Sequence, residues 1–481
     1  MQASGGGPYR HGPFYPRIGD AWHNPRPLAQ PAQREPHLAA SGLQHPARLI
    51  PLAFLAVIVL GTLLLMLPLA RADAGSAPLL TALFTSVSAV CVTGLSTVDT
   101  PVYWSGFGQV VILGLFQVGG FGIMTGATLL GMLVMRRLRL GTRLVAQAET
   151  RSLGLGDVMA VLRLILTVTV AVEAVVAAVL ALRLHYGYGE SWGQALWNGI
   201  FQSVSAFNNA GFSTYSDSLM GFVADPLVVV PIMLAIVLGG LGFPVLFELR
   251  REHRRWVRWS VHTKITLLGS AILIFGGAAM ILLYEYGNPG TLGPLEGGGK
   301  LLGALFHSVT ARTAGFNTVD VGSMRVETLA VNYVLMFIGG GSAGTAGGIK
   351  VTTFFLLGFV VWAEIHAGRD TTAFRRRISV ETQRQALTVV LLGVTVLAVA
   401  TLLLLSVSEF PLHMLMFESI SAFATVGLST GITAELPPVG QSILIVLMFV
   451  GRVGTITVAT ALALRSRQTA YRYPEERPIV G

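Results

Sequence analysis

A short phrase recurs four times in this sequence, and it constrains the fold more than any other feature. Each copy reads Ser, any residue, Ser or Thr, then Ala, and reaches a glycine several residues later. Four copies of one unit indicate an internally repeated architecture rather than a set of unrelated motifs. The copies run from Ser86 to Gly94, from Ser203 to Gly211, from Ser308 to Gly315 and from Ser419 to Gly427, the third being one residue shorter.

The segments around these copies are apolar enough to lie in a membrane. Hydrophobic residues make up 53% of the chain and charged residues only 12%, against roughly 25% charged residues in soluble globular proteins. A spanning helix needs about 20 mostly apolar residues. We predict eight spans, one of them interrupted, within residues 50–70, 108–135, 158–184, 226–247, 265–283, 329–338, 386–407 and 442–464.

The basic residues are distributed as in a membrane protein. Most of the 33 Lys and Arg fall in five segments, and these alternate along the chain with segments that hold most of the acids. An excess of Lys and Arg marks cytoplasmic segments, so we predict that both termini are cytoplasmic. The net charge of +9 therefore needs no nucleic-acid partner. The five basic segments are the N-terminal tail, residues 136–151, 250–264 and 369–384, and the C-terminal tail.

The phrase marks the end of an apolar segment that is too short to cross a bilayer. Such a segment is typical of a re-entrant helix, which enters the membrane and turns back to the side it came from. Non-helical backbone at membrane depth is tolerated only where it is buried in protein or lines a water-filled cavity. We therefore expect the four turns to converge on one axis. The short segments are residues 79–90, 192–207, 301–311 and 412–423.

The four turns contain no carboxylate, so a dehydrated cation on this axis would be held by main-chain oxygens. Glycine suits such a turn because it readily adopts a positive φ. For any single glycine, a tight turn or close packing explains the residue equally well, but four at equivalent places favour a cation filter. The predicted filter residues are Val92, Thr93, Gly94, Asn209, Ala210, Gly211, Thr313, Ala314, Gly315, Thr425, Val426 and Gly427.

An acidic residue follows each turn glycine within a few positions. Carboxylates around the outer mouth of a pathway would raise the local cation concentration. Their irregular spacing is also typical of ordinary solvated loop charges, which we favour. These residues are Asp99, Asp217, Asp320 and Glu435.

The helix after each turn carries small residues at mid-span, which let helices approach closely. Packing is therefore the expected role of these glycines as a class. In the third repeat the segment is too glycine-rich to continue a helix, because each Gly costs about 1 kcal/mol relative to Ala. We predict that the helix breaks there and forms a gating loop. Its residues are Gly339, Gly340, Gly341, Ser342, Ala343, Gly344, Thr345, Ala346, Gly347, Gly348 and Lys350.

Arg452 takes the position that glycine holds in the other three second helices. A charged residue at membrane depth is expensive and marks a functional site by default. Near the axis, the charge of Arg452 would lower cation occupancy below the filter; a structural role, tied to a carboxylate or to backbone carbonyls, stays open. Arg312 and Lys350 pose the same question, with Glu418 as a candidate partner of Arg312. Glu173 is a candidate counter-ion.

These residues resemble the Trk/Ktr/HKT superfamily of cation transporters. The resemblance runs from about residue 48 to 466, and with no additional pair of spans before the first repeat it favours the Ktr-type membrane subunit over the longer Trk type. The segments that carry it are Val92-Thr-Gly-Leu, Asn209-Ala-Gly-Phe, Arg312-Thr-Ala-Gly-Phe, Thr425-Val-Gly-Leu, Gly-Gly-Ile-Lys350-Val-Thr-Thr and Gly451-Arg-Val-Gly.

The resemblance implies a homodimer in the plasma membrane, with a pore in each protomer and a cytoplasmic ring of nucleotide-binding regulatory subunits beneath. Potassium is the implied transported ion and sodium an activating or coupling ion, with no covalent cofactor and with nucleotide on the partner only. The family's filter maps onto the four turns, its gate onto Gly339 to Gly348, and its pore arginine onto Arg452. Gly94 resembles the potassium-preferring members, whereas serine there accompanies sodium preference in some plant relatives.

We therefore predict an all-α polytopic membrane protein in which four helix, pore-helix, helix repeats surround a central pore with the pseudo-fourfold symmetry of a potassium channel. Its function would be non-enzymatic potassium uptake; the alternative is a sodium or weakly selective monovalent-cation transporter. A membrane enzyme would need clustered His, Asp or Glu at membrane depth, and His307 is isolated on its helix. The predicted boundaries are a disordered Pro-rich tail at 1–47, repeats at 48–140, 157–250, 260–368 and 380–466, and a cytoplasmic tail at 467–481.

Overall fold

The computed structural model describes residues 46–137, 158–252, 255–368 and 370–454, so most of the two predicted tails lies outside it. The described residues are mostly helical. Their one sheet consists of the two short antiparallel strands β1 (Thr372–Ala373) and β2 (Arg376–Arg377). The all-α fold predicted from the sequence is confirmed.

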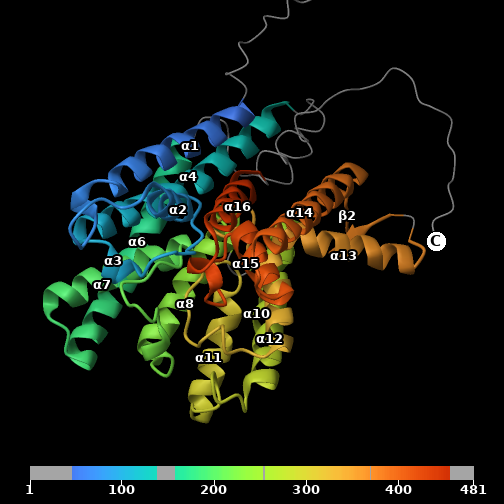
Figure 1. Ribbon diagram of the computed structural model, residues 1–481. Coiled ribbons are helices and arrows are strands. Elements are labelled where there is room, and N and C mark those ends of the chain that lie inside the picture. The colour runs from blue at the N-terminus through green and yellow to red at the C-terminus, as the bar shows by residue number, and fades with distance from the viewer. Residues whose placement is uncertain (1–45, 138–157, 253–254, 369, 455–481) are drawn as a thin grey trace, which may run out of the picture. The chain divides into compact units, whose positions relative to one another are not determined.

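The described helices form four groups in chain order (Figure 1). Each group has a long first helix, a short helix and a second helix, and the second helix is divided in two of the groups. The first group is α1 (Pro46–Leu65), α2 (Leu79–Val90), α3 (Thr100–Tyr103) and α4 (Gly106–Arg137). The second is α6 (Val158–Tyr188), α7 (Trp192–Asn208), α8 (Pro226–Leu241) and α9 (Phe243–Glu252). The third is α10 (Val261–Glu285), α11 (Gly297–Thr310), α12 (Val326–Phe337) and α13 (Val351–Ile365). The fourth is α14 (Val380–Val407), α15 (Leu412–Ala424) and α16 (Pro438–Phe449), extended by a π-helical turn at Val450–Gly454.

The four groups close into a cycle through their short helices. Each of α2, α7, α11 and α15 packs against the long helix that precedes it, α1, α6, α10 and α14. The second helix of one group also contacts the short helix of the next: α4 contacts α7, α8 contacts α11, and α12 contacts α15. The last second helix, α16, returns to the first short helix, α2. The second helices therefore link the four short helices into a closed ring.

A phenylalanine anchors each short helix at the same place, two residues before the first serine of the repeated phrase. All four rings are completely buried, and aromatic rings of this size contribute heavily to core packing. The equivalent burial shows that the four short helices pack through the same position of the repeat. These residues are Phe84, Phe201, Phe306 and Phe417.

Four of the described helices are long and apolar enough to cross a membrane, or five if α8 and α9 count as one bent span. The remaining apolar helices are shorter, and those at residues 50–65 and 438–454 border chain that the structure does not describe. The total of eight spans stays a prediction. The four long helices are Gly106–Gly126, Leu162–Tyr188, Val261–Glu285 and Val380–Val407.

The prediction of an uninterrupted span over residues 226–247 is wrong. α8 ends at Leu241, and α9 leaves it at an angle of 98°. Gly242 makes the turn with φ +90°, a conformation that side chains rarely adopt. A Cβ atom at Gly242 would also collide with the carbonyl oxygen of Ser342. The second helix is divided here because the glycine-rich segment of the third group passes directly against it.

Candidate functional site

Each short helix ends in a turn with the same unusual backbone. In each turn, two residues with positive φ flank one residue whose φ is not positive. Successive peptide planes therefore change direction. The first left-handed residue is Val92 (φ 56°), Asn209 (58°), Thr313 (80°) or Thr425 (49°). The second is the glycine: Gly94 (90°), Gly211 (72°), Gly315 (79°) or Gly427 (95°). Non-glycine residues with positive φ are uncommon, and clusters of them occur at functional sites.

The residue between the two left-handed positions is tied back to its helix. Its N–H donates to the carbonyl of the second Ser or Thr of the phrase, at 2.8 to 2.9 Å in all four turns. The pairs are Thr93 with Ser88, Ala210 with Ser205, Ala314 with Thr310, and Val426 with Ser421.

The hydroxyl groups of the phrase hold the turn in place. The second hydroxyl binds the chain at or just after the glycine: Ser88 and Ser421 accept from the N–H of Gly94 and Gly427, each at 3.1 Å. The first serine ties the short helix to its long helix in three groups and stays within its own helix in the fourth. In these bonds the serine hydroxyl donates to a backbone carbonyl: Ser86 to Ile58, Ser203 to Glu173, Ser308 to Ile274 and Ser419 to Leu415. The recurrence of the phrase thus has a local structural cause.

The four turns meet in a closed ring. A Cβ atom on each turn glycine would lie under 3.0 Å from the carbonyl oxygen of the middle residue in the next turn, and close to the Cα of the next glycine. The order around the ring follows the chain and returns to its start. Gly94 faces Ala210, Gly211 faces Ala314, Gly315 faces Val426, and Gly427 faces Thr93. We call Gly94, Gly211, Gly315 and Gly427 the ring glycines, and the four facing oxygens the carbonyl ring.

Glycines of the second helices let those helices press against the ends of the short ones. A Cβ atom on Gly119, Gly239 or Gly451 would collide with the last carbonyls of α2, α7 and α15, respectively. Their role is close packing, as predicted for these glycines as a class. The same contact would exclude any larger residue at these three positions.

Residues 339–350, here called the glycine-rich loop, connect α12 to α13 and lie against three of the four turns. Thr345 Oγ1 donates to the carbonyl of Phe207 at 3.2 Å, beside the second turn. The N–H of Gly347 donates to Thr313 Oγ1 at 3.2 Å in the third turn. A Cβ atom on Gly347 would collide with Thr425 in the fourth turn.

The glycine-rich loop is also bonded to the broken second helix. Gly341 and Thr345 donate their N–H groups to the carbonyls of Gly240 and Gly239, at 2.8 and 3.0 Å. The N–H of Phe243, the first residue of α9, donates to Ala343 at 3.3 Å. Most of the loop is buried. The backbone N–H groups of Gly341 and Thr345 are therefore paired within the protein.

Arg452 joins the fourth group to this loop. The residue is 3% exposed and lies in the π-helical turn after α16. Its Nη1 donates to the carbonyl of Thr345 at 2.5 Å, while Nε and Nη2 are buried with no hydrogen-bond partner among the described residues. No described carboxylate lies within ion-pair range of it. A guanidinium with two free donor atoms is therefore buried beside the loop.

The suggested pairing of Arg312 with Glu418 is wrong. Arg312 Nη2 donates to Ser270 Oγ at 3.2 Å and to the carbonyl of Gly339 at 3.0 Å, so it holds the start of the glycine-rich loop. Glu418 instead accepts from Ser429 Oγ at 2.7 Å and from the N–H of Thr430 at 2.9 Å. The carboxylate therefore stabilises the chain after the fourth turn rather than neutralising Arg312.

Lys350 and Glu173 are also held by uncharged partners. Lys350 Nζ donates to the carbonyl of Ala346 at 2.6 Å, within the glycine-rich loop, as suggested. Glu173 is 8% exposed and accepts from Gln117 Nε2 at 3.2 Å and Asn208 Nδ2 at 3.1 Å. Among the described residues, the candidate counter-ion thus has no cationic partner.

One recurring position of the repeat was not predicted from the sequence. A polar residue lies just before the first serine of each phrase. In three groups it binds chain that follows the turn: Gln202 donates to Ser213 at 2.7 Å, His307 pairs with Asn332 at 3.2 Å, and Glu418 accepts from Ser429. Aligning the four copies with each other reveals the position, because a polar residue recurs there in apolar helices. The residues are Thr85, Gln202, His307 and Glu418, all buried.

The four acidic residues after the turns lie exposed in loops. Asp217 accepts from the N–H of Gly221 at 3.1 Å, and Asp320 from the N–H of Gly322 at 3.0 Å. Asp99 precedes α3, and Glu435 follows the short helical turn at Ile432–Ala434. Their exposure fits solvated loop charges, and a role at the outer mouth stays a prediction.

Comparison with known proteins places the chain in a family. Its sequence matches the model of the TrkH family, described as cation transport protein, over residues 30–472. It is 39% identical to the Ktr system potassium uptake protein B of Bacillus subtilis, over 91% of this chain and 97% of the relative. It is 37% identical to the protein of the same name from Vibrio alginolyticus, over 90% and 94%.

Two further proteins extend the comparison. The potassium/sodium uptake protein NtpJ of Enterococcus hirae is 33% identical over 91% of this chain and 97% of its own length. The crystal structure of the potassium transporter TrkH from Vibrio parahaemolyticus has the same fold, with a TM-score of 0.69 at 16% identity, over 89% of this chain and 86% of that one. The family description names a transporter rather than an enzyme, in agreement with the sequence prediction. The chain belongs to the TrkH family of cation transport proteins and, within it, is similar to the Ktr system proteins.

Proposed function

We propose that this chain is the ion-conducting membrane subunit of a potassium-uptake system. The observation that carries the proposal is the closed ring of four turns, in which uncharged carbonyl oxygens from Thr93, Ala210, Ala314 and Val426 face the glycine of a neighbouring turn. The names of its relatives, which are potassium uptake proteins, support the choice of ion.

The carbonyl ring would replace the hydration shell of a cation. Rings of backbone carbonyls perform this task in known selectivity filters. The alternation of left-handed residues in each turn lets carbonyls of neighbouring peptides face one side, so the three residues of each turn supply the oxygens. No acid or base is among these twelve residues, so attraction of the ion depends on dipoles rather than on net charge.

The glycine-rich loop would act as the gate of this pathway. It lies against three of the four turns, and single side-chain hydrogen bonds join it to the second turn, to the third turn and to Arg452, beside its backbone bonds to α8 and α9. Loops of this kind rearrange on slower timescales than side chains. The buried charge of Arg452 would oppose cation occupancy next to the loop until the loop moves.

The assembly that we propose is a homodimer in the plasma membrane with both termini in the cytoplasm. A cytoplasmic ring of nucleotide-binding regulatory subunits would control the loop, with nucleotide bound to that partner and not to this chain. Sodium would activate or couple uptake, and the four exposed acids after the turns would concentrate cations at the outer mouth.

Sodium permeation is the second candidate function. A relative 33% identical to this chain carries potassium and sodium in its printed name. The presence of Gly94 in the first turn, rather than serine, favours potassium. The two functions differ only in which ion the ring prefers.

The test of this function is cation uptake by cells that lack their own potassium importers. We expect cells that express the chain, alone or with the regulatory subunit of its source organism, to grow on low potassium and to take up rubidium. Excess sodium is expected to compete weakly. Stronger competition by sodium than by potassium would favour the alternative, and no uptake of either ion by protein that reaches the membrane would contradict both.

A further inference from the structure

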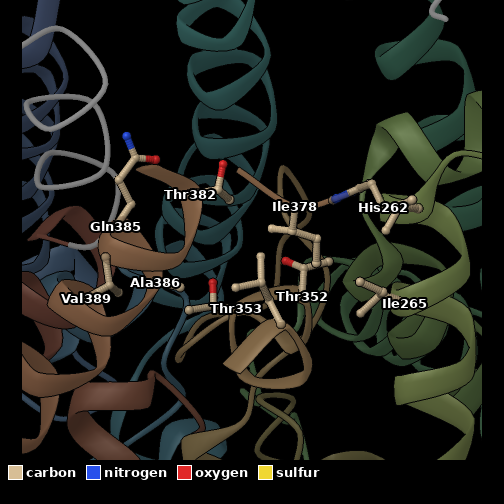
Figure 2. A pocket seen from close by; sticks show the side chains of 11 residues that line it. His262, Ile265, Thr352, Thr353, Ile378, Thr382, Gln385, Ala386 and Val389 are labelled. Atoms are coloured by element: carbon tan, nitrogen blue, oxygen red, sulfur yellow. The ribbon is translucent and has the colours of Figure 1, made fainter. Parts of the chain in front are cut away.

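A cavity of about 370 Å³ lies between α10, α13 and α14, away from the carbonyl ring. Pockets of this size hold small ligands or parts of larger ones. Its walls are mostly apolar and come from the first turns of α10 and α13 and the start of α14 (Figure 2). The apolar lining includes Val261, Ile265, Leu356, Ile378, Ala386 and Val389.

One buried polar atom in the wall of this cavity lacks a partner. His262 Nε2 is inaccessible to solvent and forms no hydrogen bond with the described residues. Its ring projects from α10 toward Ile378, opposite Gln385 and Ala386 of α14 (Figure 2). A buried nitrogen without a partner is costly. Because Nε2 has no accessible surface, it is covered by the wall rather than open to a bound molecule, so the apolar lining and the nearby charge determine what the cavity accepts.

The cavity sits where apolar and basic surfaces meet. Side chains on α13 and α14 near it are apolar and strongly exposed, among them Val361 at 57% and Leu391 at 57%. On its other side, residues 370–384 hold four arginines, at 375, 376, 377 and 384, against two acidic residues. Arg384 is exposed one residue before Gln385 of the cavity wall. This combination is complementary to a molecule with an apolar chain and an anionic head.

The cavity wall is bonded to the glycine-rich loop. Thr352 lines the cavity, and its Oγ1 lies 3.3 Å from Ser342 Oγ of the loop. The N–H of Val351, the first residue of α13, donates to the carbonyl of Gly340 at 3.0 Å. A molecule that spreads or fixes the first turn of α13 therefore acts directly on the loop.

We propose that this cavity binds one acyl chain of an anionic phospholipid, with the headgroup on the basic segment 370–384, and that the bound lipid biases the glycine-rich loop. Basic pockets between membrane helices on the cytoplasmic side bind anionic headgroups in this way. The distribution of Lys and Arg assigns this side to the cytoplasm. The effect on the loop rests on the proposed gating function, whereas the binding of lipid does not.

The test compares two phenylalanine variants one residue apart on α14. Ala386 is 7% exposed and lines the cavity, so Ala386→Phe fills it; Leu387 is 49% exposed, so Leu387→Phe adds the same ring outside. Each protein is purified with phosphatidylglycerol, and the lipid it retains is counted by native mass spectrometry. Since each acyl methylene contributes to binding, we expect about tenfold less retained lipid for Ala386→Phe and no change for Leu387→Phe.

A second variant and a flux measurement separate binding from gating. His262→Leu removes the unpartnered nitrogen at similar volume and, because that atom is covered, is expected to leave lipid retention close to that of the unaltered protein. In vesicles of phosphatidylethanolamine, adding phosphatidylglycerol should change rubidium flux through the unaltered protein and the Leu387→Phe variant, but not through Ala386→Phe. Equal retention by Ala386→Phe and Leu387→Phe would overturn the site. Loss of retention with an unaltered flux response would overturn its link to the loop while leaving potassium transport intact.

Discussion

Replacing any one ring glycine with serine is expected to reduce rubidium uptake by about thirtyfold, the equivalent of about 2 kcal/mol, and to weaken the preference for potassium over sodium. Two physical effects act together. All four glycines have φ between 72° and 95°, which serine adopts at a cost. The new Cβ would also meet the backbone carbonyl of the next turn at under 3.0 Å. Backbone cannot move aside as a flexible side chain does, so the ring itself must widen.

Two glycines inside longer helices serve as controls. Gly114 in α4 and Gly276 in α10 have no atom within 4 Å of an added Cβ and do not have positive φ. Gly114→Ser and Gly276→Ser should therefore leave uptake and selectivity close to those of the unaltered protein. Unchanged selectivity in all four ring variants, with protein present in the membrane, would count against the filter. Equal losses in the ring and control variants would point to general instability.

Replacing Arg452 with methionine is expected to raise the maximal rate of rubidium uptake by about tenfold, because about 1.4 kcal/mol of repulsion between cation and guanidinium is removed. The substitution keeps a similar length while it removes both the buried charge and the hydrogen bond to Thr345. The loop loses one of its side-chain anchors at the same time. Uptake is measured at saturating rubidium, where occupancy next to the loop limits the rate.

Arg452→Lys is the matched control, because it keeps the positive charge but changes the donor geometry. It should stay close to the unaltered rate if charge is what limits transport. A rise as large as that of Arg452→Met would assign the effect to the hydrogen bond instead. A protein that assembles with Lys but fails to assemble with Met would show that Arg452 has a structural role, since its only partner among the described residues is a backbone carbonyl.

Local pattern was sufficient to predict the short helices and their turns. The segments expected at residues 79–90 and 412–423 agree within one residue with α2 and α15. Both the helix and its turn depend on neighbouring residues: a buried phenylalanine, the two hydroxyl residues of the phrase, and the glycine. These residues lie within a dozen positions of one another and recur four times. The short helix and its turn can therefore be predicted without knowledge of three-dimensional contacts.

Contacts between distant segments were harder to predict. The break at Gly242 depends on the glycine-rich loop, about 100 residues later in the chain, which passes against it. Arg312 binds Ser270 and Gly339 rather than Glu418 for the same reason: the choice among buried partners depends on packing geometry. Side-chain type predicts that a buried charge needs a partner but does not identify it.

The polar position before each first serine was only partly predictable from the sequence. Glu418 and His307 differ in charge and size, yet each binds chain that follows its own turn. Taken singly, each residue resembles a functional group in the membrane. Only the comparison of the four copies reveals that the position serves to hold the turn, and the partners differ because the loops after the turns differ.

The most direct measurement is the position of rubidium bound to the protein, located by its anomalous X-ray scattering in crystals grown with rubidium in place of potassium. We expect a peak enclosed by the carbonyl oxygens of Thr93, Ala210, Ala314 and Val426, weakened or lost in the Gly427→Ser variant. Rubidium found only beside exposed carboxylates such as Asp217 and Asp320, with none inside the carbonyl ring, would contradict it.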